Sequence, residues 1–154
     1  MIWRLSTTLM LTVAVGLAAQ ADDAKDKALK ELEGEWQAVE AEVNGKKAPE
    51  KQVKELRLVF EGEKITVKGA GGAGGERKKT FWIDPSQSPK HIDITSLDGQ
   101  EKDQTAACIY KVEKDRLTIC MPYSTTEVDK RPKEFKTKDG DGLMLIVLER
   151  VKSK

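Results

Sequence analysis

Few side chains in this sequence have the chemistry of a catalyst or a metal ligand. The 154 residues include one histidine and two cysteines, too few for a zinc site or for most histidine-based catalysis. The histidine, His91, is followed at two-residue spacing by Asp93 and Thr95. Residues two apart on one strand face lie about 7 Å from each other, too far for these short side chains to form a catalytic triad. We therefore expect a polar outer strand face, with no metal and no cofactor.

A second group of residues combines an acid, a base and a phenol. Arg131 and Glu134 lie close in the sequence, and Tyr110 could join them to bind an anion or move a proton. The alternative is a structural tie between the Arg-Pro turn and a neighbouring strand. Because the sequence contains no recognisable pair of nucleophile and base, we assign no catalytic residue.

A glycine-rich stretch contains the G-x-G-x-x-G pattern of dinucleotide sites, from Gly69 to Gly74. In such sites the loop opens a helix whose N-terminus binds the pyrophosphate. Here residues 77–83 follow instead, and they alternate as a strand does. We therefore predict a long hairpin loop, and a solvated rim for the basic residues 77–79.

The first 21 residues predict a targeting segment rather than part of the fold. Arg4 precedes an uncharged apolar run from Leu5 to Leu17, and small residues follow up to Ala21. This pattern is typical of a secretory signal peptide cleaved after Ala21, with a retained N-terminal anchor as the alternative. We expect an exported chain, periplasmic or secreted, whose mature domain spans residues 22–154 without a membrane span.

The charge balance argues against nucleic acid as a partner. The chain has 27 Lys and Arg residues and 26 Asp and Glu residues, for a net charge of +1. A dedicated nucleic-acid binder needs a basic surface, which this balance does not supply. The length is that of a single domain, and we expect a monomer.

Two-residue alternation of apolar and polar side chains predicts strands along most of the mature chain. Leu58 and Phe60 alternate in this way, as do Ile65 and Val67 after the turn Gly62-Glu63. The register pairs Phe60 with Ile65 and Leu58 with Val67, which gives one apolar face. Further strands are expected at 80–83, 91–95, 105–112, 117–121, 133–136 and 143–151.

Short strands joined by turns, without crossover helices, indicate an antiparallel sandwich or barrel. One short helix is expected over residues 24–33, because Ala28, Leu29 and Leu32 fall on one apolar face and Gly34 ends it. Residues 143–148 are apolar on both faces. They indicate a strand covered on both sides, with the N-terminal helix as the candidate outer cover.

The two cysteines, Cys108 and Cys120, flank a predicted hairpin. Export favours a disulfide between them. The apolar register pairs Val112 with Leu117, however, and this pairing directs the two sulfurs to opposite faces of the sheet. A one-residue shift would align them, so both states of the pair remain open.

Gly34 and Trp36 open the first strand and resemble the G-x-W signature of the lipocalins. Trp36 is out of phase with Val39 and Ala41, so either a bulge intervenes or the indole closes one end of a barrel. In lipocalins this tryptophan packs at the closed end of an eight-stranded barrel, beneath an arginine from a late strand. The resemblance implies Arg150 as that arginine, since a guanidinium can stack on an indole.

A series of short motifs extends over nearly the whole mature chain. The motifs are L-x-G-x-W at 32–36, N-G-K at 44–46, L-x-F-x-G at 58–62, P-x-x-I-D at 89–93, I-Y at 109–110, D-x-L-x-I-C at 115–120, R-P-x-x-F at 131–135 and L-x-R at 148–150. Together they resemble the lipocalin-like domain family expanded in planctomycetes, whose members are usually exported. The resemblance implies a small lipocalin-like barrel and implies no particular activity.

The expected fold is therefore a mainly-β, antiparallel lipocalin-like barrel of about eight strands with a short N-terminal helix. We predict that it binds a small apolar or amphipathic ligand in the barrel or at its mouth, with Tyr110, Arg131, Glu134 and Trp82 as candidate contacts. The alternative is an envelope interaction or inhibitor module without a ligand cavity. That module would show a filled barrel and an exposed aromatic patch.

Overall fold

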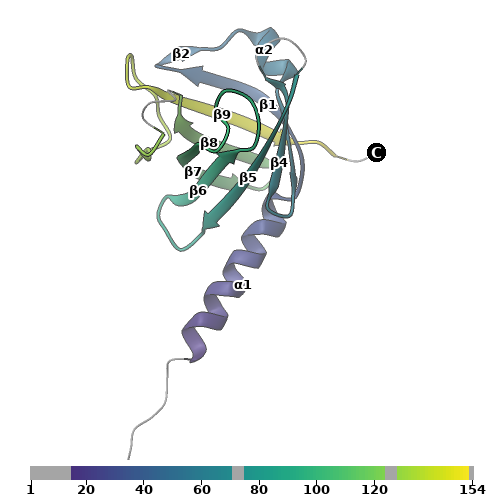
Figure 1. Ribbon diagram of the computed structural model, residues 1–154, viewed down its shortest axis with the longest axis vertical. Helices are drawn as coiled ribbons and strands as arrows, with labels where there is room; N and C mark the ends of the chain where they lie inside the picture. The colour runs from purple at the N-terminus through teal and green to yellow at the C-terminus, as the bar shows by residue number, and fades with distance from the viewer. Residues whose placement is uncertain (1–14, 71–74, 124–127, 153–154) are drawn as a thin grey trace, which may run out of the picture.

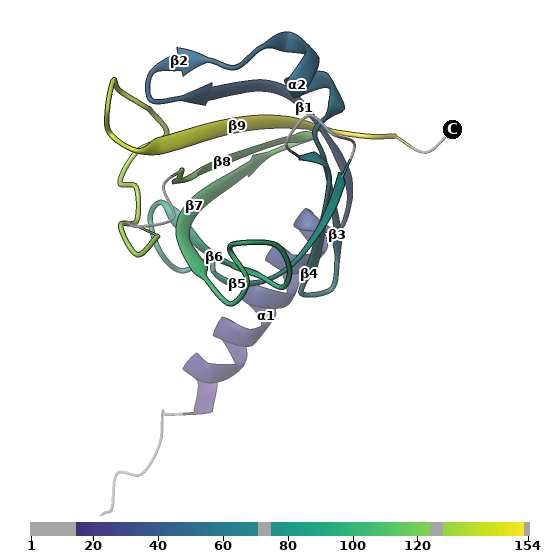
Figure 2. The same ribbon diagram turned by 45° about the horizontal axis from the view of Figure 1, so that its top comes forward.

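The chain folds into a closed antiparallel β-barrel, with a helix projecting from one end (Figure 1, Figure 2). The computed structural model describes residues 15–70, 75–123 and 128–152. In chain order the elements are α1 (Val15–Leu32), β1 (Gly34–Val43), β2 (Lys46–Lys47), α2 (Glu50–Glu55), β3 (Arg57–Glu61), β4 (Lys64–Ala70), β5 (Gly75–Asp84), β6 (Lys90–Ser96), β7 (Thr105–Glu113), β8 (Arg116–Pro122) and β9 (Leu143–Arg150).

Eight of these strands form the barrel wall. Each of β3 to β8 pairs with two neighbours, and an antiparallel pairing of β1 with β9 closes the ring. The two-residue β2 extends the sheet beside β1. The prediction of a mainly-β, lipocalin-like barrel of about eight antiparallel strands is thereby confirmed.

The predicted hairpin registers are also confirmed. Phe60 pairs with Ile65 and Leu58 with Val67 across β3 and β4, as the alternation of apolar residues requires. The same apolar face continues around the ring and supplies the barrel interior. The most deeply buried large side chains there include Trp36, Phe60, Tyr110, Leu117, Ile119 and Leu148.

The buried side chains of this core occupy the interior, and Val67, Ala106, Met121 and Met144 pack against it while staying partly exposed. Each of its side chains is at most 7 % exposed, and the rings of Phe60 and Phe81 pack edge to face with their centres 5.3 Å apart. Edge-to-face packing at this distance is favourable and leaves no room for a ligand between the rings. The core therefore occupies the position in which a ligand-carrying barrel holds its cargo.

The two ends of the barrel differ. α1 and the β3–β4, β5–β6 and β7–β8 hairpins lie at one end, which we call the closed end. α2 and the β4–β5, β6–β7 and β8–β9 connections lie at the other, which we call the open end (Figure 2).

The N-terminal helix is longer than expected, because α1 spans Val15–Leu32 rather than residues 24–33. Its packing face is the predicted one: Ala28 and Leu32 are buried, and Leu29 packs against the core. Residues 15–21 of the predicted targeting segment continue the helix, and residues 1–14 lie outside the described residues. None of the helices within the described ranges is long and apolar enough to span a membrane.

Two expectations about the outer surface are wrong. α1 lies at the closed end and contacts β5, so it does not cover the outer face of β9. Residues 133–136 form no strand; they belong to a segment without regular structure, residues 128–142, which we call the strap. Within the strap, Pro132 has no N–H to donate to a ladder and is buried, as is the outward-facing Ile109 of β7. The strap thus lies against the barrel wall without forming a strand, and the N–H of Ala107 in β7 donates to the carbonyl of Val128 at 2.7 Å.

Candidate binding surfaces

The closed end is built on a stack of Trp36 and Arg150. The guanidinium carbon of Arg150 lies 4.1 Å from the centre of the indole ring. Its two terminal nitrogens donate hydrogen bonds to the carbonyl oxygens of Glu31 (2.6 Å), in the last turn of α1, and of Glu33 (2.5 Å), directly after α1. The indole Nε1 donates to the carbonyl of Leu32 at 2.8 Å. These contacts join the first strand, the last strand and the C-terminal end of α1.

Two backbone features bring Trp36 to this position. Gly34 has a φ of +110°, and a Cβ there would lie 3.3 Å from a guanidinium nitrogen of Arg150. Between Ala38 and Glu40 the register of β1 against β9 shifts by one residue, which is a β-bulge. The bulge explains why Trp36 is out of phase with the residues that follow it. The structure therefore contains both of the features that the sequence left as alternatives.

Tyr110 lies inside the barrel, and only 1 % of its surface is exposed. Its hydroxyl has no hydrogen-bond partner among the described residues. Burial, and then the nearby carboxylates of Glu31 and Asp84, raise the pKa of Tyr110 to about 12. The phenol is thus a neutral member of the core that faces the closed end.

Arg131 lies outside the barrel, on the strap. It donates to the carbonyl of Cys108 at 2.5 Å and forms an ion pair with Asp93 at 2.6 Å. Asp93 is on the outer face of β6, because Ile92 and Ile94 take the inner face. Arg131 therefore ties the strap to β6 and β7, and the barrel wall separates it from Tyr110.

Glu134 also lies on the strap, where it is exposed and pairs with Lys136 (3.6 Å) and Lys138 (4.0 Å). The structure thus does not bring Tyr110, Arg131 and Glu134 together. Such exposed pairs between neighbouring residues contribute little to stability.

Trp82, the fourth candidate contact, stands on the outer face of β5 and is 50 % exposed. It lies in an open trough of about 820 Å³ that crosses the outer face of the wall from β4 to β7, and we call this hollow the Trp82 trough. Asp93 is the cross-strand partner of Trp82, so the tie made by Arg131 borders the trough. Its lining comprises Glu61, Gly62, Glu63, Lys64, Thr80, Phe81, Trp82, Asp93, Thr95 and Thr105.

Hydroxyl groups form one side of the Trp82 trough. The side-chain oxygens of Thr95 and Thr105 lie 2.7 Å apart and share a hydrogen bond. Thr80 is the cross-strand partner of Thr95, so three neighbouring strands each present a threonine. A hydroxyl can donate once and accept twice, so this pair retains capacity for further hydrogen bonds.

The opposite side of the Trp82 trough is charged. The ammonium of Lys25, on α1, lies 5.9 Å from the centre of the Trp82 ring and 3.7 Å from Glu63. An ammonium at this distance from an indole is within the range of a cation–π contact. α1 therefore touches the trough at its edge and leaves half of the indole surface exposed.

A second hollow, of about 740 Å³, lies over β1 and β9 beside α2 and β2. Its apolar lining includes Val39, Leu145 and Val147, and charged residues of β1, β2 and α2 surround them. Leu145 and Val147 lie on the outer face of β9, the strand that the sequence predicts to be covered on both sides.

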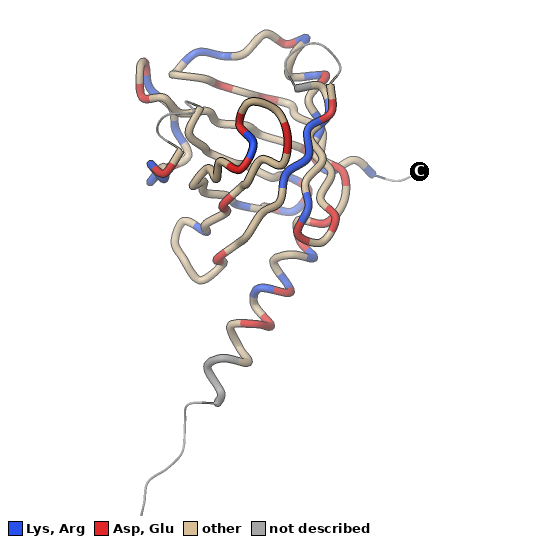
Figure 3. Tube along the Cα trace, in the orientation of Figure 1, with Lys and Arg blue, Asp and Glu red and all other residues tan. Residues whose placement is uncertain are grey.

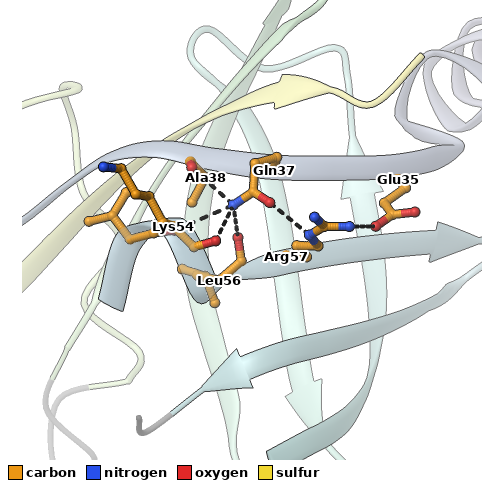
Figure 4. Close-up of polar contacts among 7 residues, drawn as sticks. Glu35, Gln37, Ala38, Lys54, Leu56 and Arg57 are labelled. Carbon is orange, nitrogen blue, oxygen red and sulfur yellow. Dashed lines mark hydrogen bonds and ion pairs between the residues drawn. The ribbon is translucent and has the colours of Figure 1, made fainter. Parts of the chain in front are cut away.

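The position of α2 beside this hollow depends on Gln37 (Figure 4). The amide nitrogen of Gln37 donates to the carbonyls of Lys54 and Leu56, both at 3.0 Å, and its oxygen accepts from Arg57 at 2.7 Å. Arg57 in turn pairs with Glu35 at 2.9 Å. Carbonyls at the end of a helix have no partner within the helix, and Gln37 supplies one. A glutamine within a strand carries no sequence signal for this role.

The cysteines occupy opposite sides of the barrel wall. Ile109 pairs with Cys120, the predicted register, which places Cys108 in the core and Cys120 under the strap. Both thiols are free and buried, and burial raises both of their pKa values, that of Cys120 to about 11. Of the two possibilities that the sequence leaves, a disulfide and two free thiols, the observed register therefore fits the free thiols.

The glycine-rich stretch connects β4 and β5. Ala70 pairs with Gly75, so the chain forms the predicted hairpin, and residues 71–74 lie outside the described residues. Gly69 has a φ of +76° and packs against the end of α2. The strand that follows excludes the helix N-terminus that a dinucleotide site requires.

Comparison of the chain with protein-family models, with characterised proteins and with solved structures finds no match.

Proposed function

We propose that this chain is an exported binding module that holds a small amphipathic ligand on the outside of its barrel wall, in the Trp82 trough. The observation that carries the proposal is the contrast between a filled interior and a half-exposed indole in a hollow of about 820 Å³. Most tryptophans are largely buried, so one that stands open among polar groups is a candidate contact for a ligand.

The chemistry of the Trp82 trough supports an amphipathic ligand. The indole offers a flat apolar surface, while Thr95, Thr105 and Asp93 offer hydrogen-bonding atoms beside it. A ligand with one apolar face and a polar edge would use both. Export follows from the targeting pattern of residues 1–21 and is part of the proposal.

Native mass spectrometry of the protein purified from its own host tests this proposal. We expect an additional mass that is lost on denaturation, and that is absent from the Trp82→Ala variant. The matched control is Tyr123→Ala, because Tyr123 is also exposed (57 %) but does not line the trough. A bare protein in every sample, or a bound mass that Trp82→Ala retains, would contradict the proposal.

An envelope protein partner is the second candidate. It is favoured by the filled barrel together with two exposed aromatic side chains, Trp82 and Tyr123. Cross-linking in the host would then yield a protein adduct that depends on Trp82, in place of a small bound mass.

A further inference from the structure

We infer that the ligand of the Trp82 trough is a neutral saccharide. This inference rests on the proposed function and specifies its ligand. It is carried by four observations: the exposed indole, the adjacent hydroxyls, the charge balance of the trough, and the shortness of the free strand edges in the part of the wall that forms it.

The indole supplies the apolar contact that a sugar requires. One face of a pyranose ring presents several C–H groups, and this face stacks well on a flat aromatic surface. Trp82 stands on the outer wall with 50 % of its surface exposed. Because it projects from a paired strand, its position is held by the sheet and not by a loop.

The groups around the indole supply the polar contacts. Sugar hydroxyls need partners that both donate and accept, and Thr95 and Thr105 can each do both. Asp93 accepts one hydrogen bond from Arg131, and a carboxylate has about four acceptor positions, so others remain for a ligand. Arg131 at the same time fixes the orientation of the carboxylate.

The charges of the Trp82 trough balance, which favours a neutral ligand. Acidic and basic residues are interspersed along the helix and the wall (Figure 3). The trough has three acids, and three bases accompany them: one in the lining, one on α1 and one on the strap. Such a surface has no net attraction for a phosphate, an acidic glycan or a polyamine. The six residues are Glu61, Glu63, Asp93, Lys64, Lys25 and Arg131.

The topology argues against an extended peptide as the occupant. Peptides that bind to sheets add a strand to an exposed edge, where backbone hydrogen bonds give the affinity. In the Trp82 trough, β4 and β6 are paired on both sides, and β5 lacks a β4 partner only at residues 81–84. Residues 105–108 of β7 lack a β8 partner, but there the N–H of Ala107 and the carbonyl of Cys108 form hydrogen bonds with the strap, so the free edge is too short for an extended peptide. A lipid is disfavoured as well, since Trp82 is the only exposed large apolar side chain of the trough.

Titration calorimetry of the full protein with short neutral oligosaccharides, namely gluco-, manno-, galacto- and xylo-oligomers, tests the inference. We expect at least one to bind, and Trp82→Ala to weaken that binding by about tenfold or more. Replacing both threonines by valine, which preserves their shape, should weaken it by a smaller factor. Tyr123→Ala should leave it unchanged.

Salt dependence separates a neutral sugar from a charged ligand. We expect the affinity to stay constant between about 0.05 and 0.5 M salt, because no ion pair forms on binding. If no neutral oligosaccharide binds while the host-purified protein carries a mass that depends on Trp82, the sugar inference is overturned and the proposed function stands. If neither binding nor a Trp82-dependent mass is found, both are overturned.

Discussion

Arg150, in the last strand, covers the face of Trp36, near the start of the first, at 4.1 Å from the centre of its ring. The same guanidinium donates to two carbonyl groups at the C-terminal end of α1, those of Glu31 and Glu33. We expect Arg150→Lys to lower the free energy of unfolding by about 2 kcal/mol, because an ammonium cannot stack and reach both carbonyls at once. Urea denaturation measures the change. Arg116→Lys is the control, since Arg116 makes only longer ion pairs at the surface; equal losses in the two variants would refute this role of Arg150.

Tyr110→Phe should preserve or increase stability. The phenol is buried with its hydroxyl unpaired, and an unpaired buried polar group costs about 1–3 kcal/mol. We therefore expect an increase of up to about 1 kcal/mol in the free energy of unfolding at neutral pH. A clear loss of stability would show that the hydroxyl has a partner in solution. Thermal unfolding of the wild-type protein and of Tyr110→Phe measures this difference in stability.

Alkaline pH should enlarge the difference between wild-type protein and Tyr110→Phe. Burial raises the pKa of Tyr110 from its ordinary value of 10 to about 12, so the folded state holds the phenolic proton more tightly than the unfolded state does. The stabilisation is complete below pH 10 and is lost as pH rises toward 12. The advantage of the phenylalanine variant should grow by on the order of 2 kcal/mol over this interval. All other side chains are the same in both proteins, so the difference between the two curves isolates Tyr110.

Gly69 and Gly62 form a matched pair of positions, both with positive φ. A Cβ at Gly69 would lie 2.0 Å from the carbonyl oxygen of Glu55, whereas a Cβ at Gly62 would have nothing within 4 Å. We expect Gly62→Ala to cost about 1 kcal/mol, from backbone strain alone. Gly69→Ala should cost about 2 kcal/mol more, because α2 must also shift. Urea denaturation gives both values, and similar losses would mean that α2 does not press on this hairpin.

Arg131→Ala should release the strap from the wall. Cys120 is buried beneath the strap, near the carbonyl of Lys136, while Cys108 is buried in the core. Because burial raises the pKa of both thiols, neither should react with a disulfide reagent in the native protein near pH 8. In Arg131→Ala we expect Cys120 to react about tenfold faster or more, and Cys108 to stay protected.

Peptide mapping of the labelled protein identifies which thiol has reacted. Lys133→Ala, an exposed position of the strap, should leave both rates unchanged. Equal acceleration of both thiols by Arg131→Ala would indicate opening of the whole barrel instead of local release.

The barrel and its registers could be predicted because a two-residue period assigns each side chain to a face. Phe60 and Ile65, or Tyr110 and Ile119, can both face inward in only one register. The same rule explains why the predicted group of Tyr110, Arg131 and Glu134 does not form. An inward phenol cannot meet an arginine that lies outside the wall.

The rest could not be predicted because it depends on contacts between distant segments. α2 has six residues, too few to show a helical period, and the side chain that holds its end, Gln37, lies in another element. The strap shows alternation because it covers apolar residues, not because it pairs as a strand. For the Trp82 trough, the sequence places His91, Asp93 and Thr95 on one outer face, but only the packing of four strands brings Trp82 and Thr105 beside them.

Closure of the barrel by β1 and β9 has a consequence for the time at which the chain can fold. Trp36 pairs with Arg150 near the end of the sequence, so the first strand gains its second neighbour only when the last strand is present. Contacts of such long sequence separation form late, because the entropy of closing the intervening loop must be lost first. A chain that emerges from a ribosome N-terminus first would remain open until β9 is free. For the export proposed above, this means that the chain would still be unfolded when a narrow translocation channel requires an extended substrate.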